Sequence, residues 1–332
     1  MTVLPLAIAL GDPAGIGPEI VARAWDNRAA AQLPLFFAVG DARSIAAVWD
    51  GPVCPIASPD EAASVFDHGL PLIQVADAAT PIPGHPDLEG ARCALDSLEL
   101  ATGLVRSGAA AALVTGPVCK AQLYAIGFTH PGQTEFVSER FGISSDNTVM
   151  MLAGPDLKVV PVTTHIPLAD VPSHLDSELI CAKVRVTVRA LQRDFGISEP
   201  RIAIAGLNPH AGENGEIGRE EIDIIEPAIR QLREEGFHVT GPLAADAMFH
   251  PRARAQYDVA ICLYHDQALI PLKTLHFDDG VNTTLGLPAI RTSPDHGTAF
   301  DIAGKGLARP DAMIAAIRMA AACVERRQAA CC

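Results

Sequence analysis

Short apolar runs alternate with helical segments along most of this chain of 332 residues. Strand-like runs lie at residues 4–10, 35–39, 71–75, 110–115, 201–205 and 257–263, and helical stretches lie at about 18–25, 87–106 and 177–193. This alternation is typical of parallel strands that are joined by helical crossovers. The sequence therefore predicts a doubly wound α/β fold.

Local signals add detail to this expectation. Asp41 directly follows a strand-like run and predicts the N-cap of a helix, and Thr134 predicts a second N-cap in the turn PGQTE. The pair Gly154-Pro155 separates two apolar runs, residues 148–152 and 158–163. This pattern favours an antiparallel hairpin.

Length, charge and cysteines limit the class of protein. A single core seldom exceeds roughly 250–300 residues, so two domains are expected. The formal net charge of −14 argues against nucleic acid and anionic membranes as partners, because both bind clustered cations. No apolar stretch approaches the ~18 residues of a membrane span, and the first apolar run has no basic region before it. The eight cysteines form no C-x-x-C pair, which is typical of a reducing compartment, so we expect a cytoplasmic protein.

The stretch from residue 264 to residue 305 has the composition of a site. It follows the strand-like run 257–263 directly, and the carboxyl end of a strand is where open α/β folds bind ligands. Prolines and glycines indicate turns between its polar groups. These groups are His265, Asp266, Gln267, Lys273, Asn282 and Arg291.

Three histidines follow apolar strands in equivalent positions. His165, His210 and His265 each lie in a predicted loop shortly after a strand-like run. If the strands belong to one sheet, all three loops open on its carboxyl edge. Three neutral imidazoles there would form a His₃ site for a divalent metal such as Zn²⁺. Three unrelated loop histidines are the alternative, and spacing alone does not decide between the two.

A metal and a group of cations together would suit the oxidation of a hydroxy acid. A bound metal lowers the pKa of a substrate hydroxyl, so that hydride can leave to a nicotinamide. Lys273, Asn282 and Arg291 would hold the anionic end of the substrate, and the planar fork of arginine suits phosphate. The alternatives are surface charge for Lys273, a turn for Asn282 and a structural ion pair for Arg291.

The motifs of the chain, taken in order, resemble those of the 4-hydroxythreonine-4-phosphate dehydrogenases of pyridoxal-phosphate biosynthesis. These motifs are GDPAGIGPE, TGPVCK, GQTEF, THIPL, GLNPHAGENGEIG, YHDQALIPLK and VNTTLGLPAIRTSPDHGTAFDIAGKG. The resemblance extends from about Ala7 to Ala308. It implies the NAD- or NADP-dependent oxidation of 4-phosphooxy-L-threonine to 3-amino-2-oxo-4-phosphooxybutyrate, which loses CO₂ to give 3-amino-2-oxopropyl phosphate.

The resemblance also implies a fold and an assembly. The fold would be similar to isocitrate and isopropylmalate dehydrogenases, with two α/β/α domains and an active-site cleft between them. The first domain would contain residues 1–130 and 285–332, and the second, residues 131–284, would carry the metal ligands and dimer contacts. The site of the homodimer would be shared, with two metal-binding histidines from one subunit and the third from its partner.

Site residues follow from the same motifs. The family binds zinc, magnesium or cobalt through histidines that match His165, His210 and His265. Its substrate contacts match Thr134, Lys273, Asn282 and Arg291, and an acidic residue near its site matches Asp246, so that Asp246 and Lys273 are the candidate catalytic residues. Gln133 replaces the histidine of the usual GHTE motif. Because glutamine can donate a hydrogen bond but cannot carry charge, the substrate contact of Gln133 is expected to differ.

Three hypotheses for the function compete. The first is the metal- and NAD(P)-dependent dehydrogenase, with a phosphorylated four-carbon sugar acid, of the phospho-threonate or erythronate type, as the alternative substrate. The second is an acyltransferase that acts on phosphate esters, since the same fold class includes such enzymes and they need no histidine triad. The third is a non-catalytic protein that binds an anion or a metal.

Overall fold

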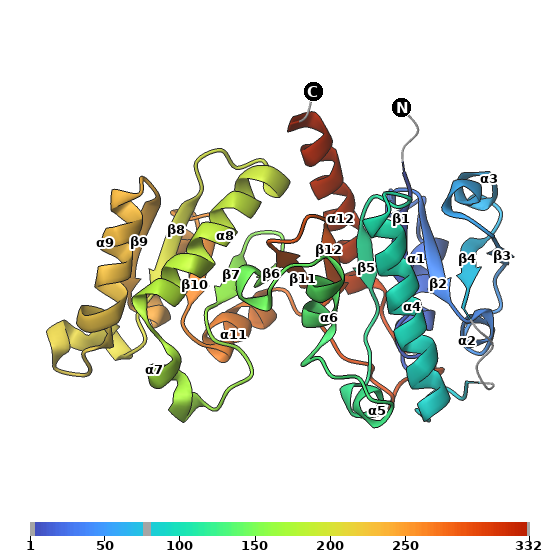
Figure 1. Ribbon diagram of the computed structural model, residues 1–332, viewed down its shortest axis with the longest axis horizontal. Helices are drawn as coiled ribbons and strands as arrows, with labels where there is room; N and C mark the ends of the chain where they lie inside the picture. The colour runs from blue at the N-terminus through green and yellow to red at the C-terminus, as the bar shows by residue number, and fades with distance from the viewer. Residues whose placement is uncertain (1–3, 76–80, 331–332) are drawn as a thin grey trace. The chain divides into compact units, whose positions relative to one another are not determined.

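The computed structural model describes residues 4–75 and 81–330, and the chain forms two compact units (Figure 1). The first unit contains Met1–Ser145 and Leu287–Glu325, and the second contains Asp146–Gly286 and Arg326–Cys332. Each unit is an α/β structure, as the alternation of apolar and helical segments predicted. The domain boundaries at residues 130 and 285 remain a prediction.

The first unit is built on parallel strands. Their order is β3-β4-β2-β1-β5-β12, and each neighbouring pair is parallel. The strands are β1 (Leu6–Ala9), β2 (Phe36–Gly40), β3 (Val53–Pro55), β4 (Leu70–Gln74), β5 (Leu113–Thr115) and β12 (Arg291–Pro294). Strands β1, β2 and β5 are buried along their whole length. This explains their continuous apolar sequence, since strands of a covered parallel sheet are apolar on both faces.

Helices connect and cover these strands. They are α1 (Gly17–Asp26), α2 (Ala42–Ala46), α3 (Ala62–Val65), α4 (Leu88–Arg106), α5 (Lys120–Ala125), α6 (Gln133–Arg140) and α12 (Asp311–Ala330), with the short η1 (Pro59–Glu61) and η2 (Ser145–Asn147). The long helix α4 packs on β1 and β2 through buried residues such as Ala94, Leu98 and Ala101.

The predicted caps have different outcomes. Asp41 caps α2, because its side chain accepts a hydrogen bond from the backbone N–H of Arg43 at 2.9 Å. The prediction that Thr134 is an N-cap is wrong. Helix α6 begins one residue earlier, at Gln133, with the extended Gly132 as its N-cap. Thr134 therefore lies in the first turn of the helix.

The second unit is a mixed sheet with the order β11-β6-β7-β10-β8-β9. Its strands are β6 (Val149–Ala153), β7 (Lys158–Pro161), β8 (Arg201–Ala205), β9 (His238–Leu243), β10 (Val259–Cys262) and β11 (Val281–Leu285). Strand β6 is antiparallel to β7 and β11, which confirms the predicted hairpin, whereas β7, β10, β8 and β9 are parallel. A core cluster that includes Leu152, Val159, Ala203, Ala260 and Leu272 joins these strands to α11.

Helices connect the strands of the second unit. They are α7 (Val171–His174), α8 (Ser177–Phe195), α9 (Glu226–Glu234), α10 (Pro251–Arg254) and α11 (His265–Leu275). Short helical turns are η3 (Leu168–Asp170), η4 (Pro209–Gly215), η5 (Glu221–Ile225) and η6 (Ala245–Ala247), of which η5 is a π-helix. Helix α11 contacts β6, β7 and β10, and α8 contacts β6 and β11.

Within residues 4–75 and 81–330, no helix is long and apolar enough to cross a membrane. The six cysteines of this part of the chain are free thiols: Cys54, Cys93, Cys119, Cys181, Cys262 and Cys323.

Candidate active site

Three neighbouring parallel strands of the second unit end beside the three histidines. The order β7-β10-β8 confirms the expectation that these strands lie together and point the same way. His165 follows β7, His265 follows β10, and His210 follows β8. All three residues therefore leave the sheet at its carboxyl edge, the edge at which α/β folds bind ligands.

His265 is the first residue of α11, so the expectation that it lies in a loop is wrong. Tyr264 is the N-cap of this helix and keeps an extended backbone, and helical geometry begins at the next residue. The Nδ1 atom of His265 lies 2.7 Å from a carboxylate oxygen of Asp266. Because an ionised carboxylate only accepts, Nδ1 carries the hydrogen and the lone pair lies on Nε2. Histidines that bind metals are oriented by such a carboxylate.

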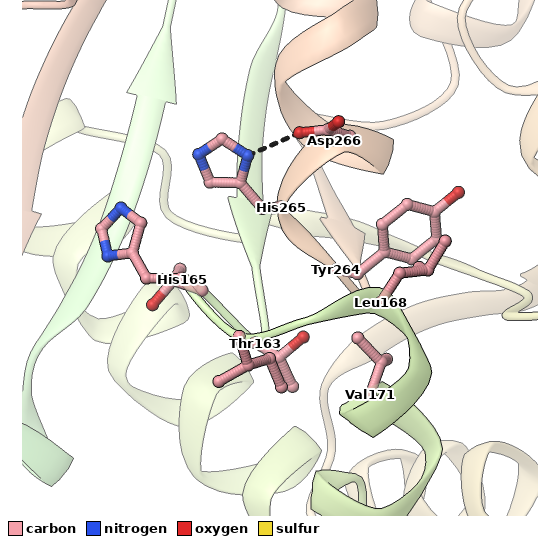
Figure 2. Close-up of a pocket in the computed structure, with 9 residues that line it drawn as sticks. Thr163, His165, Leu168, Val171, Tyr264, His265 and Asp266 are labelled. Carbon is pink, nitrogen blue, oxygen red and sulfur yellow. Dashed lines mark hydrogen bonds and ion pairs between the residues drawn. The ribbon is translucent and has the colours of Figure 1, made fainter.

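His165 lies next to His265. The centroids of the two rings are 5.6 Å apart, and Figure 2 shows both rings extending to the same side of the strand ends. The backbone of His165 has a φ of +54°, which is in the left-handed region. Such a conformation is uncommon for a residue with a Cβ atom and is concentrated at functional sites.

His210 begins a run of left-handed residues. Residues 210–214 all have φ between +42° and +81°, and only Gly212 among them lacks a Cβ atom. Each non-glycine residue in this conformation costs roughly 1–2 kcal/mol, so other contacts must hold the turn. No group of three potential ligands for a metal is present within residues 4–75 and 81–330. The chain by itself thus brings together His165 and His265, and it does not bring His210 to them.

A cavity of about 240 Å³ adjoins the histidine pair. It is lined by Thr163, Thr164, His165, Ile166, Leu168, Val171, Tyr264, His265 and Asp266 (Figure 2). The Tyr264 ring lies on the side of Leu168 and Val171, away from the two imidazoles. The cavity therefore has an apolar wall on one side and the imidazoles on the other.

A continuous set of hydrogen bonds ties the three strand ends together. The Thr163 hydroxyl donates to the Leu263 carbonyl at 2.8 Å, and the Leu263 N–H donates to the Gln267 side-chain oxygen at 2.6 Å. The Gln267 amide nitrogen then donates to the Gly206 carbonyl at 2.8 Å. Gln267 is buried, so both of its bonds are shielded from water. This residue fixes the end of β10 against the end of β8.

Of the other candidate residues of the second unit, Asp246 follows the end of β9, whereas Lys273 and Asn282 lie further from the carboxyl edge of the sheet. Lys273 is in the last turn of α11, eight residues after His265 and so about 12 Å further along the helix axis. Asn282 lies in β11 opposite Leu152, and its Oδ1 atom is buried without a hydrogen-bond partner in the described part of the chain. The alternative interpretation of Asn282 as a turn residue is therefore wrong. Asp246 is exposed on η6, a turn that contacts the His210 turn η4.

In the first unit, Arg291 is a buried cation. Arg291 is the first residue of β12 and is 4% exposed. One Nη atom donates to the Thr115 hydroxyl at 2.7 Å, and the other lies 3.4 Å from the Thr134 hydroxyl. Burial lowers the pKa of Arg291 to about 10, and the charge of Glu135 acts in the opposite direction. The guanidinium stays charged at neutral pH, and a nearby anion would stabilise it.

Gln133 turns its amide nitrogen to the protein. The Nε2 atom donates to the Gly116 carbonyl at 3.1 Å, and the Oε1 atom is buried without a hydrogen-bond partner in the described part of the chain. Because a backbone carbonyl only accepts, this orientation of the amide is set by chemistry. The atom of Gln133 that has no hydrogen-bond partner in the described part of the chain is therefore an acceptor.

Several residues of the site were not assigned a role from the sequence. Asp266 and Gln267 stood out as polar groups, but their partners, the neighbouring His265 and the distant Gly206, could not be read from spacing. Thr115, which ends β5, binds Arg291 across 176 positions of sequence. The usable signal is the position of each polar residue at, or within five residues of, the end of a strand.

Two solved structures with a similar fold and at least 30% sequence identity are dehydrogenases. A 4-hydroxythreonine-4-phosphate dehydrogenase from Klebsiella pneumoniae has a TM-score of 0.84 and 37% sequence identity, over 96% of this chain and 99% of that one. A terephthalate 1,2-cis-dihydrodiol dehydrogenase from Burkholderia xenovorans has a TM-score of 0.64 and 30% identity, over 97% and 98% of the two chains. The class of the protein is therefore an oxidoreductase with an α/β fold.

Sequence comparison gives the family. The sequence model described as pyridoxal phosphate biosynthetic protein PdxA matches residues 33–320. A 4-hydroxythreonine-4-phosphate dehydrogenase from Zymomonas mobilis is 60% identical over 98% of this chain and 97% of its own length, and one from Erythrobacter litoralis is 54% identical over 97% of each. The chain belongs to this family, the 4-hydroxythreonine-4-phosphate dehydrogenases of pyridoxal-phosphate biosynthesis.

Proposed function

We propose that the protein oxidises 4-phosphooxy-L-threonine with NAD or NADP in the synthesis of pyridoxine 5'-phosphate. The product, 3-amino-2-oxo-4-phosphooxybutyrate, then loses CO₂ to give 3-amino-2-oxopropyl phosphate. The observation that carries the proposal is the pair of imidazoles at the carboxyl edge of the second unit, one of them oriented by Asp266, in a chain of this family.

The histidines fit a divalent metal such as zinc, magnesium or cobalt. Two imidazoles on one tetrahedral ion place their ring centroids about 5 Å apart, and those of His165 and His265 are 5.6 Å apart. We propose His210 as the third ligand, with two ligands from one subunit of a homodimer and the third from its partner. When bound, the metal would lower the pKa of the substrate hydroxyl and polarise the carbonyl oxygen.

Polar side chains of the candidate set would bind the substrate. Arg291 would pair with an anionic group, phosphate or carboxylate, because its planar fork suits both. The Thr134 hydroxyl already lies at hydrogen-bond distance from Arg291 and would share the same anion. The buried acceptors of Asn282 and Gln133 suit hydroxyl or ammonium groups of the substrate.

Proton transfer would fall to Lys273 and Asp246. Oxidation of the alcohol sends hydride to the nicotinamide and releases the hydroxyl proton to a base, and the enolate left by the loss of CO₂ takes up a proton at carbon. Lys273 is half-buried on the helix that His265 begins, and Asp246 is exposed beside the His210 turn. The family motifs, in which both residues match side chains at or near the site, support roles for Lys273 and Asp246 in handling protons.

The replacement of the family histidine by Gln133 allows one alternative substrate class. A side-chain carbonyl oxygen accepts from a hydroxyl group as well as from an ammonium group. A 4-phosphorylated hydroxy acid, of the phospho-threonate or erythronate type, carries a hydroxyl where 4-phosphooxy-threonine carries its amino group. We propose such an acid as the second candidate substrate.

An assay of NAD(P)H formation by absorbance tests the proposal. The full-length protein is assayed with 4-phosphooxy-threonine, phospho-threonate and phospho-erythronate, with and without a chelator. We expect the highest kcat/KM with 4-phosphooxy-threonine and the loss of activity on chelation, with recovery when a divalent metal is restored. A rate that does not respond to the chelator would remove the metal from the mechanism.

The variant His210→Ala separates the dehydrogenase from the other two classes. It should lose metal binding and turnover, whereas an acyltransferase would keep its activity. A protein that only binds an anion or a metal would form no NAD(P)H with any of the three acids. The exposed His238 provides the matched control, since it begins β9 at the opposite end from the site.

A further inference from the structure

A buried carboxylate supports the turn that carries His210. Glu221 is 2% exposed and begins the π-helix η5. Its Oε1 atom accepts a hydrogen bond from the backbone N–H of Asn208 at 2.8 Å, and its Oε2 atom accepts from the Asn208 side-chain amide at 2.9 Å. Both oxygens of Glu221 thus hold the residue that lies two positions before His210.

The chain is shaped to bring this carboxylate close. A Cβ atom on Gly212 would lie 2.6 Å from Oε2 of Glu221, and one on Gly206 would lie 3.1 Å from Oε1. A Cβ atom on Gly218 would lie 2.3 Å from the Asn208 amide. Glycine at these three positions therefore leaves space for the Asn208–Glu221 contact, which lies inside the loop and is not an incidental surface contact.

The turn needs such support. Residues 210–214 are all left-handed, and this conformation is unfavourable for the four that have a Cβ atom. A turn of this kind persists only where the surroundings determine it, and the end of β8 and the π-helix provide these surroundings. π-helical turns are themselves concentrated at functional sites.

We propose that Glu221 is a positioning residue. Its carboxylate fixes Asn208 and thereby holds the left-handed turn in the conformation that presents the His210 imidazole to the metal. This role rests on the proposed function, in which His210 is a metal ligand. Groups that orient metal ligands typically change metal affinity by a factor of about 10 to 100 when they are altered.

The test compares Glu221→Gln with Asp223→Asn in the full-length protein. The first change is nearly isosteric, but the new amide nitrogen faces the amide nitrogen of Asn208, so one hydrogen bond is replaced by a contact between two donors. The second makes the same chemical change on the same π-helix, at a carboxylate that is 52% exposed and pairs with Arg219. Asn208→Ala removes the same side-chain contact from the other partner and guards against a folding defect in the first variant.

Two measurements are made on each protein. Hydrogen exchange of the metal-free protein reports the backbone of residues 207–216, and titration with Co²⁺, followed by its visible absorption spectrum, reports the affinity and the ligand field. We expect Glu221→Gln and Asn208→Ala to exchange faster in residues 207–216 alone. We also expect both to bind Co²⁺ about tenfold more weakly or worse, with an altered spectrum. Asp223→Asn should match the unaltered protein.

The outcomes that overturn the proposal are distinct. Faster exchange with unchanged Co²⁺ affinity and spectrum would make Glu221 a structural residue of the loop and no more. Unchanged exchange would show that Glu221 does not hold the turn. If the unaltered protein itself binds no Co²⁺, the proposed metal site is wrong, and the role of Glu221 in positioning a ligand is rejected with it.

Discussion

Arg291 and Asp12 illustrate how burial sets the chemistry of individual residues in the first unit. Arg291 is buried, is held by two threonine hydroxyls, and keeps its charge with a pKa of about 10. Asp12 is 1% exposed, and burial raises its pKa to about 6, although the N–H of Ala14 donates to it. The positive charge of Arg291 favours an anion beside it, and the ionised form of Asp12 is unfavourable in its buried position.

Arg291→Lys should weaken substrate binding with little change in stability. Lysine keeps the positive charge but loses the planar fork that reaches Thr115 and Thr134 together. A charged hydrogen bond contributes about 1.5–3 kcal/mol, so KM for the phosphorylated substrate should rise about 10- to 100-fold. Steady-state kinetics check this, with Arg318→Lys as the control. An unchanged KM would exclude Arg291 from the substrate site.

Asp12→Asn should stabilise the protein above pH 6. Because the pKa of about 6 in the folded state exceeds the ordinary aspartate value of 3.8, the folded state binds more protons between these values, and stability falls as pH rises through this window. At pH 7.5 asparagine should raise the free energy of unfolding by up to about 3 kcal/mol, and this gain should shrink as the pH falls towards 4. Denaturant unfolding at both pH values measures it. A gain that does not depend on pH would contradict the role of ionisation.

At the scale of elements, the ends of β7, β10 and β8 form one hydrogen-bonded edge. Thr163, Leu263, Gln267 and Gly206 connect these ends in sequence. The sheet fixes the positions of the residues that follow these three strands. A helix start and a left-handed turn can therefore carry parts of one site.

Gln267→Leu should destabilise the second unit. The change leaves the Leu263 N–H and the Gly206 carbonyl buried without their partner, and each such group costs about 1–3 kcal/mol. We expect a loss of about 2–5 kcal/mol in the free energy of unfolding, measured with denaturant. The exposed Gln256→Leu is the matched control. Equal free energies of unfolding for the two variants would show that the hydrogen bonds of Gln267 contribute nothing to stability.

The sequence predicted elements well where a periodic pattern and a cap agree. The hairpin at Gly154-Pro155 and the cap at Asp41 are examples. It failed at the starts of two helices, since His265 is already the first residue of α11 and Thr134 is one residue inside α6. Left-handed geometry at His210 was also out of reach, because the contacts that stabilise it come from Glu221, eleven positions later.

At the scale of the whole molecule, the fold and the family agree with the predictions made from the sequence, and the assembly that would complete the metal site is a proposal. The six described cysteines are free thiols. The described chain brings two of the three histidines together and contains no group of three ligands. A homodimer that shares its sites would provide the third imidazole, since a two-fold axis gives each site the same residue from the other subunit.

Mixing of inactive variants measures this sharing directly. His165→Ala, His210→Ala and His265→Ala are mixed in pairs, unfolded and refolded together, and assayed for NAD(P)H formation. If two ligands come from one subunit and one from its partner, two of the three mixtures should recover roughly a quarter of the sites. The mixture of the His165 and His265 variants should stay inactive, because those rings are neighbours in one chain. Recovery in none of the three mixtures, although the refolded unaltered protein is active, would contradict a metal site shared between subunits.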